Sequence, residues 1–335
     1  MKLLLNLFLL TTWFSLHGLN QFFKTPQPRF YASSAAKQRT FIWIKHQTHL
    51  PDSASGLVEI PFRRAGNLIL VEGEVNGQAG WFILDTGAPN LILNAAHQPC
   101  GRVNTTHCAI GSTGKVSGGR RVTVQRFQWG LSQLTNREVD ACDLSHLEKN
   151  KGEKILGLIG INLFKNYEVV LDYSQSRLMF YRLNRAGQRM LSESPAPKPD
   201  GVIALDFRGH LPVVVAQVGR RSLLFGLDTG AEMNLLDRHF KDKIADYLHI
   251  SLLGSVQGNS PATQSAIAAE VVGLTFGPLV FQKMPILLTS MAHLNAAYNT
   301  HLDGMLGFDF LSSRLMAINF IRKELYWWNT WIVRK

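Results

Sequence analysis

The chain has 335 residues, enough for two domains of ordinary size. Hydrophobic residues make up 46% and charged residues 18% of the sequence, which supports packed cores and excludes a largely disordered protein. The formal net charge is +11, so the protein is basic. The basic residues are scattered and no recognition motif accompanies them, so we expect no nucleic-acid partner.

The N-terminus has the features of an export signal. Lys2 is followed by an apolar run that is too short to span a bilayer comfortably. We predict a signal peptide over residues 1–18, a linker over residues 19–55, and an exported protein that is periplasmic or secreted. Small residues offer a cleavage site at two places, and an uncleaved segment would instead anchor the protein to a membrane.

The chain has three cysteines, an odd number, which export would place in an oxidising compartment. Cys100 and Cys108 are near enough in sequence to close a short loop. We therefore predict a disulfide between these two and a free thiol at Cys142. The alternative is a metal site formed by the same two cysteines with His97 and His107. Their spacing matches no standard zinc pattern, so we predict no metal.

The sequence repeats its own motifs in the same order. Leu84–Ala88, which reads Leu-Asp-Thr-Gly-Ala, returns 143 positions later as Leu227–Ala231. Gly157–Gly160 returns 147 positions later as Gly304–Gly307, and the apolar stretch that follows each of these segments repeats by the same shift. The nearly constant spacing indicates a duplicated domain.

Short apolar and β-branched runs, separated by polar turns such as Asn76-Gly77, predict strands throughout both halves. We expect an all-β protein with a few short helices. The first homologous half spans residues 56–183 and the second spans residues 201–335. Three prolines in the stretch 184–200 cannot continue a helix or a strand ladder, so this stretch is predicted to be a linker.

Each Asp-Thr-Gly-Ala loop follows an apolar strand, and its glycine permits a tight turn that projects the carboxylate. A twofold relation between the halves would bring Asp85 and Asp228 face to face. Two carboxylates about 3 Å apart cannot both ionise, so they share a proton. One can then act as a base on water and the other as an acid, and this chemistry needs no metal or organic cofactor.

These motifs resemble those of the aspartic proteases of the pepsin and retropepsin superfamily, and the resemblance extends over both halves. It implies two β-barrel lobes related by a pseudo-twofold axis, with a cleft between them for an extended peptide. Asp85 and Asp228 would be the catalytic pair. The threonines of that superfamily interlock across the two loops, a role that would fall on Thr86 and Thr229. The residues that would support the catalytic loops are Thr86, Gly87, Ala88, Thr229, Gly230, Ala231, Gly157, Gly160, Gly304 and Gly307.

In that superfamily a glycine-rich hairpin, the flap, closes over the bound peptide. Between the repeated motifs, the glycine-rich stretches of both halves are candidate flaps, and the alternative for each is an ordinary surface hairpin. The candidate flap residues are Gly111, Ser112, Thr113, Gly114, Gly254 and Ser255.

Ala88 and Ala231 stand where pepsins usually carry Ser or Thr, so the sequence looks retropepsin-like. Because both lobes lie in one chain, it is similar to the fused, two-lobed retropepsin-like proteins of bacteria. We predict a monomer that contains an intramolecular pseudo-dimer. Its predicted function is that of an aspartic endopeptidase. The rival is an inactive peptide-binding envelope protein of the same fold, but both catalytic loops are intact. A purely structural envelope protein would leave the repeated motif unexplained.

Overall fold

The computed structural model describes residues 56–98, 109–111, 114–116, 119–190, 198–257 and 263–329. The predicted signal peptide and the linker that follows it lie outside these residues. Strands dominate the described chain, and its helices are short, which confirms the all-β prediction. The helical elements are α1 (Ser145–Lys151), α2 (Ala292–Tyr298), α3 (Phe308–Leu311) and four 3-10 turns, η1 (Ala95–His97), η2 (Ile161–Leu163), η3 (Arg238–Phe240) and η4 (Ala245–Tyr247). None of the described helices is long and apolar enough to cross a membrane.

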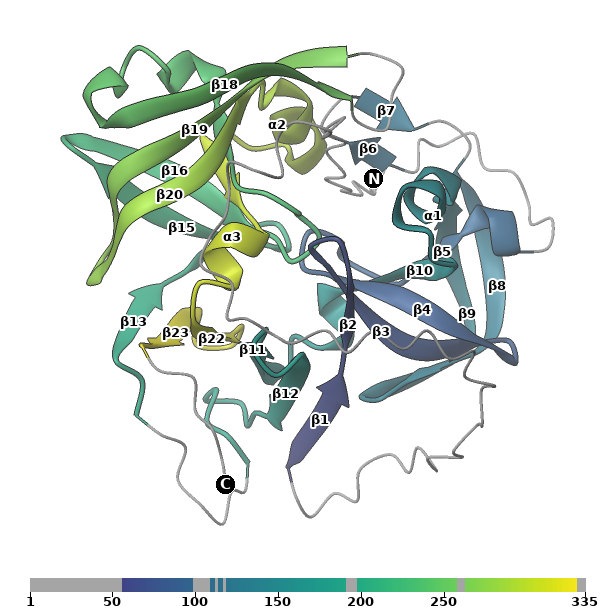
Figure 1. The fold of residues 1–335 in the computed structure, drawn as a ribbon. Helices are drawn as coiled ribbons and strands as arrows, with labels where there is room; N and C mark the ends of the chain where they lie inside the picture. The colour runs from purple at the N-terminus through teal and green to yellow at the C-terminus, as the bar shows by residue number, and fades with distance from the viewer. Residues whose placement is uncertain are drawn as a thin grey trace, which may run out of the picture.

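The first barrel lies on the right of Figure 1. Its strands are β2 (Arg63–Ala65), β3 (Leu68–Val75), β4 (Gln78–Asp85), β5 (Ile92–Asn94), β8 (Arg120–Trp129), β9 (Ser132–Cys142) and β10 (Ile155–Gly160). Their order is β2-β3-β4-β10-β5-β9-β8, and a second pairing of β3 with β8 closes six of them into a barrel. Asn76 and Gly77, both with positive φ, form the tight turn between β3 and β4 that the sequence predicts.

The second barrel repeats this topology, and Figure 1 shows it at the upper left. Its strands are β14 (Asp206–Arg208), β15 (Leu211–Val218), β16 (Arg221–Leu227), β17 (Leu235–Asp237), β18 (Leu248–Gln257), β19 (Thr263–Phe276), β20 (Leu279–Thr289) and β21 (Gly304–Leu306). The order is β14-β15-β16-β21-β17-β20-β19-β18, and β15 pairs again with β19. Each strand of the first barrel therefore has a counterpart at the same place in the second.

A third sheet joins the two barrels. It contains β1 (Leu57–Pro61), β11 (Tyr167–Asp172), β12 (Arg177–Arg182), β13 (Gly201–Ala204), β22 (Leu315–Asn319) and β23 (Glu324–Trp328). The order β1-β12-β11-β22-β23-β13 takes three strands from each half of the chain. We call it the shared sheet. The repeated apolar stretches of the sequence meet at its centre, where β11 and β22 pair antiparallel.

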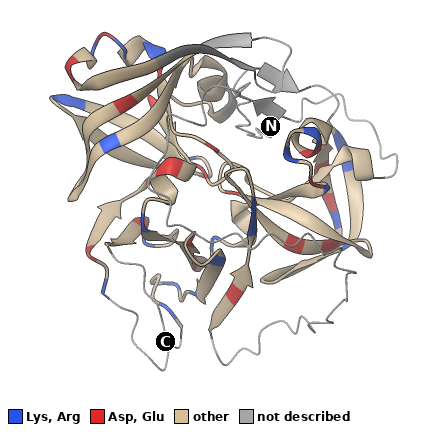
Figure 2. Ribbon diagram, viewed as in Figure 1, with Lys and Arg blue, Asp and Glu red and all other residues tan. Residues whose placement is uncertain are grey.

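Burial explains why the catalytic loops are held firmly. The last four residues of β4 are all buried, and β10 is buried along its whole length. The main core runs from the first barrel across one face of the shared sheet into the second barrel. Charged residues lie outside this core, and Figure 2 shows both signs interspersed over the two lobes. The two lobes therefore form one packed body around their junction.

Candidate active site

Both predicted catalytic loops start at the ends of buried strands, at the junction of the lobes. β4 ends at Asp85, which pairs with Gly160 at the end of the parallel strand β10. In the second lobe β16 ends at Leu227, which pairs with Leu306 of the parallel strand β21. The next residue, Asp228, donates its main-chain N–H to Leu306 O over 2.9 Å. The two aspartates therefore occupy equivalent places.

Two threonines join the loops. The main-chain N–H of Thr86 donates to Oγ1 of Thr229, and that of Thr229 donates to Oγ1 of Thr86, each over 3.0 Å. The hydroxyl of Thr86 donates to Leu227 O over 3.0 Å, and that of Thr229 donates to Leu84 O over 2.8 Å. All four hydrogen bonds are buried, so this interlock fixes one loop against the other in the arrangement that the resemblance implies.

Main-chain N–H groups donate to one oxygen of each carboxylate, Oδ1. Oδ1 of Asp85 accepts from the N–H of Gly87 over 2.8 Å and from that of Ala88 over 3.1 Å. Oδ1 of Asp228 accepts from the N–H of Gly230 over 2.8 Å. It also accepts from the N–H of Gly87 over 3.2 Å, so this single donor lies between the two carboxylates.

The second oxygen of each carboxylate, Oδ2 (the outer oxygen), is buried without such donors in the described part of the chain. Both aspartates are 0% exposed, and Oδ2 of each has no hydrogen-bond partner among the described residues. Burial and then the charge of Asp228 raise the pKa of Asp85 well above its usual value. Burial also raises the pKa of Asp228, to about 6, although main-chain donors oppose this change. The charged forms are disfavoured, so the pair shares a proton and titrates as a unit.

Glycines at six predicted positions permit close packing around the dyad. A Cβ on Gly87 would stand 2.8 Å from Asp228 Oδ2, and one on Gly230 would stand 2.8 Å from Cγ of Asp85. At these two positions only glycine leaves room for the carboxylate of the opposite loop. On the supporting strands, a Cβ would stand 2.2–2.4 Å from a main-chain oxygen at Gly157, Gly160, Gly304 and Gly307.

The glycine-rich stretches form hairpins. In the first lobe β6 (Ala109–Gly111) pairs with β7 (Gly114–Val116), and Gly111 lies opposite Gly114. Ser112 and Thr113 lie outside the described residues. β6 lies against α2 of the other lobe, so this hairpin reaches across the junction (Figure 1).

In the second lobe the predicted flap residues belong to a long hairpin formed by β18 and β19. Gly254 and Ser255 lie within β18, where they pair with Ala266 and Ser265. They therefore belong to one arm of the hairpin, while its tip, residues 258–262, lies outside the described residues.

The prediction for the cysteines is wrong. Cys142 is disulfide-bonded, so it is not a free thiol, and its partner lies outside the described residues. The chain has only two other cysteines, so Cys100 and Cys108 cannot be bonded to one another. The physical reason is spatial. Parallel pairing of β5 with β9 sets Cys142 beside Asn94, six positions before Cys100. Proximity along the chain was the weaker guide.

We expect a non-reduced digest to contain Cys142 in a bridged peptide, because its side chain is fully buried at the end of β9 and is already bonded. Mass mapping before and after reduction measures this and identifies the partner. Recovery of Cys142 as a free thiol would contradict the structure.

For the alternative metal site, Cys100, His107 and Cys108 lie outside the described residues. The fourth candidate, His97, lies in η1, where its Nε2 is 2.5 Å from Glu148 Oε1. The described residues contain no cluster of three or more side chains that could hold a metal ion.

Two residues that sequence reasoning missed reach the first catalytic loop from the second lobe. His210 Nε2 lies 2.8 Å from Gly87 O, and the hydroxyl of Tyr298 donates to the same oxygen over 3.1 Å. Burial and then the charges of Asp228 and Asp85 raise the pKa of Tyr298 well above its usual value. Neither residue belongs to a motif. The shifts of 143 and 147 positions between the two halves make Asn67 the counterpart of His210 and Lys151 the counterpart of Tyr298.

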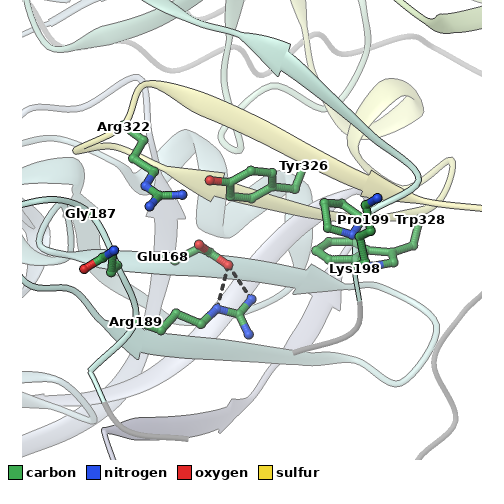
Figure 3. A pocket seen from close by; sticks show the side chains of 9 residues that line it. Glu168, Gly187, Arg189, Lys198, Pro199, Arg322, Tyr326 and Trp328 are labelled. Atoms are coloured by element: carbon green, nitrogen blue, oxygen red, sulfur yellow. Dashed lines mark hydrogen bonds and ion pairs between the residues drawn. The ribbon is translucent and has the colours of Figure 1, made fainter. Parts of the chain in front are cut away.

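A pocket of about 390 Å³ lies on the face of the shared sheet that is turned away from the main core. Figure 3 shows Glu168 of β11 inside it, bonded to Arg189 from the stretch between the lobes. Lys198 and Arg322 also line it. None of the predicted catalytic residues lines this pocket, so it is separate from the dyad.

Comparison with known proteins agrees with this geometry. Residues 71–163, most of the first lobe, match the family described as "Aspartyl protease". No curated protein matches the sequence. Among solved structures, the crystal structure of Basic 7S globulin from soybean is similar over 82% of this chain and 94% of that chain, with 12% sequence identity and a TM-score of 0.45.

So distant a structural likeness carries no weight by itself, and the fold assignment rests on the strand order of the two barrels. The family match covers the Asp85 loop and the supporting strand β10. The first lobe is thus similar to that family over residues 71–163, and the second lobe repeats the Asp-Thr-Gly-Ala loop and the strand that supports it.

Proposed function

We propose that the protein is an active aspartic endopeptidase. The observation that carries the proposal is the paired arrangement of Asp85 and Asp228. Both carboxylates are buried, both bond the N–H of Gly87, and both outer oxygens lack a partner among the described residues. Buried carboxylates with raised pKa values suit proton transfer near neutral pH.

The pKa difference suggests how the roles divide. Asp85 keeps the shared proton, and Asp228, with a pKa raised to about 6, is ionised in the resting enzyme. Asp228 takes a proton from water as the water oxygen attacks the peptide carbonyl carbon. Asp85 gives its proton to the carbonyl oxygen. When the C–N bond breaks, Asp228 passes its proton to the leaving amine and Asp85 recovers its own from the hydroxyl of the intermediate.

The hairpins support an extended peptide as the substrate. The β6–β7 hairpin of the first lobe lies against α2 of the second, and the β18–β19 hairpin belongs to the opposite lobe. Strand arms of this kind can pair with an extended backbone through main-chain hydrogen bonds. Such bonds bind the peptide without depending on its side chains.

The test is digestion of a mixed peptide library, with and without a statine-type transition-state inhibitor. We expect internal cleavage that the inhibitor suppresses. If the protein binds the inhibitor or library peptides but cleaves nothing at any pH, it is the inactive peptide-binding protein of the rival hypothesis. Cleavage that a chelator stops and the inhibitor does not would require a different mechanism.

The pH dependence of kcat/KM should show an acidic limb near pH 6. Below the pKa of Asp228, which is about 6, the second carboxylate gains a proton and the base is lost. The higher pKa of Asp85 sets the basic limb. The optimum is therefore expected above the strongly acidic range. Initial rates at low substrate concentration over a pH series measure both limbs.

A double substitution, Ala88→Ser and Ala231→Ser, tests what sets the acidic limb. A serine hydroxyl at either place would donate to an ionised carboxylate and lower its pKa. The acidic limb should therefore move to lower pH. A limb that stays in place or moves upward would show that burial, the largest cause of both raised pKa values, or another neighbouring group sets the titration.

A further inference from the structure

Each lobe sends two side chains across the junction to the loop of the other lobe. In the first lobe they are Asn67, at the β2–β3 turn, and Lys151, the last residue of α1. In the second lobe they are His210, at the β14–β15 turn, and Tyr298, the last residue of α2. These are equivalent positions of the repeat. We call each pair of side chains, Asn67 with Lys151 and His210 with Tyr298, a clasp, and the two clasps differ in chemistry.

The clasp from the first lobe is charged. It binds Glu232, which follows the Asp228 loop and is only 8% exposed. Asn67 donates its side-chain N–H to Glu232 O over 2.9 Å and its main-chain N–H to Glu232 Oε2 over 3.3 Å. Lys151 forms an ion pair with the same carboxylate. None of these contacts involves a group that bonds the dyad.

The clasp from the second lobe is neutral, and it binds a main-chain carbonyl. Gly87 O accepts from both His210 and Tyr298. A carbonyl oxygen can only accept, so His210 carries a proton on Nε2. Burial lowers the pKa of His210, which favours its uncharged form. The two rings lie 5.7 Å apart between centroids.

The neutral clasp is connected to the dyad through a single peptide group. The carbonyl of Gly87 belongs to the peptide whose N–H, on Ala88, donates to Oδ1 of Asp85 over 3.1 Å. Donors on a carbonyl polarise the amide and strengthen its N–H as a donor, because hydrogen bonds in a chain reinforce one another. The two side chains therefore act on the carboxylate of Asp85 without touching it.

We propose that His210 and Tyr298 are positioning residues of the dyad, which orient the Gly87–Ala88 peptide so that its N–H stabilises negative charge on Asp85. This inference rests on the proposed protease function, in which Asp85 must release its proton during the reaction. The clasp makes that release easier, and it acts on one aspartate only. The dyad is thereby made asymmetric although its two loops are equivalent.

Other titratable groups among the described residues interact with the dyad. The aspartates face each other, and Tyr298 is near enough for both of their charges to raise its pKa. Burial and, to a smaller extent, the charge of Asp228 raise the pKa of Tyr173. Arg64 acts on Tyr173 in the opposite direction. Of these groups, only Tyr298 also bonds the Gly87 carbonyl.

The test uses Tyr298→Phe, His210→Phe and the double variant. Each single variant leaves Gly87 O with one donor, so kcat should fall only about threefold, while the double variant leaves a buried carbonyl without these donors and should lose about 100-fold. The basic limb of the pH–rate profile should move upward, because Asp85 holds its proton more tightly. The proposal would be overturned if the loss of kcat in the double variant equalled the product of the two single losses and the basic limb stayed in place.

Two variants serve as controls. His210→Gln places an amide N–H close to the position of the imidazole Nε2. It should restore both the wild-type kcat and the wild-type position of the basic limb. Tyr167→Phe removes a phenol hydroxyl from the shared sheet, far along the chain from the loops, and should leave rate and limb as in the wild type. A Gln variant that resembles His210→Phe would point to ring packing as the role of His210.

A second readout separates this proposal from the protease function. Titration of ¹³C-labelled Asp carboxyls by NMR follows Asp85 even in a protein that cleaves nothing. Its titration should move upward in the single variants and further in the double variant. If the wild type cleaves peptides but these titrations do not move, the positioning role fails and the protease function stands. If the double variant does not fold, unmoved titrations in both single variants overturn the proposal.

Discussion

Replacing Asp85 or Asp228 with Asn should remove nearly all peptide hydrolysis. One carboxylate cannot supply both the base and the acid, and each proton transfer contributes about 10²–10⁴-fold to the rate. Asn keeps the shape of the side chain, and its Oδ1 can still accept the main-chain N–H bonds of the loop. Single-turnover cleavage of a library-derived peptide measures the loss. Wild-type turnover in either variant would contradict the shared-dyad mechanism.

Thermal unfolding separates lost chemistry from lost folding. Burial raises the folded-state pKa of Asp228 to about 6, well above the ordinary pKa of an aspartate. Stability contributed by its protonated form is therefore complete below the unfolded-state pKa and is lost as the pH rises through 6. Asp228→Asn escapes this loss. Its Tm should equal or exceed that of the wild type at pH 7, and the difference should shrink toward pH 4. A lower Tm at pH 7 would show that the substitution damages the fold.

The second large effect is expected for Gly307→Ala, at the end of the second supporting strand. The new Cβ would stand 2.3 Å from Ala231 O and 2.8 Å from Met233 O. Main-chain atoms of the catalytic loop cannot move aside without shifting Asp228. We expect a loss of about 3 kcal/mol or more of unfolding free energy, together with loss of activity. Denaturant unfolding followed by tryptophan fluorescence measures the first quantity.

Gly130→Ala is the matched control. Its Cβ would meet only the Ile60 side chain, 2.6 Å from Cδ1 and 3.0 Å from Cγ1, and no main-chain atom, so a change of the Ile60 rotamer can relieve the contact. We expect a cost below about 1 kcal/mol and normal activity. Equal stability of the two alanine variants would mean that the loop of the second lobe can yield, and that Gly307 is not required by close approach.

The parts of the site that sequence reasoning recovered are local. A loop such as Leu84–Ala88 carries its strand, its turn and its carboxylate within five residues, and its repetition implied the twofold relation. The interlock of Thr86 with Thr229 followed from the family resemblance. The two all-β lobes also followed from the repeat and the resemblance, but the order of their strands came only from the structure.

The parts that sequence reasoning missed depend on distant segments. The contact of Tyr298 with Gly87 O spans 211 positions and joins two lobes. No periodicity or motif marks such a pair, since a phenol in a short helix is usually core. The bridge of Cys142 was missed for a related reason: sheet pairing, not chain separation, decides which cysteines meet. Only the alignment of the halves could have drawn attention to Tyr298.

The central pairing of the shared sheet bears on why two lobes reside in one polypeptide. Val170 lies opposite Ala317, its own counterpart in the repeat. A separate first lobe would expose β11 as an unpaired edge that could join a second copy around Val170. In that homodimer Glu168 would face Asp172, and like charges opposite each other are destabilising. In the fused chain Asn319 replaces the second carboxylate and donates to Glu168 over 3.0 Å. A single chain can therefore hold an unlike pair at this place, which a symmetric homodimer of the first lobe could not form.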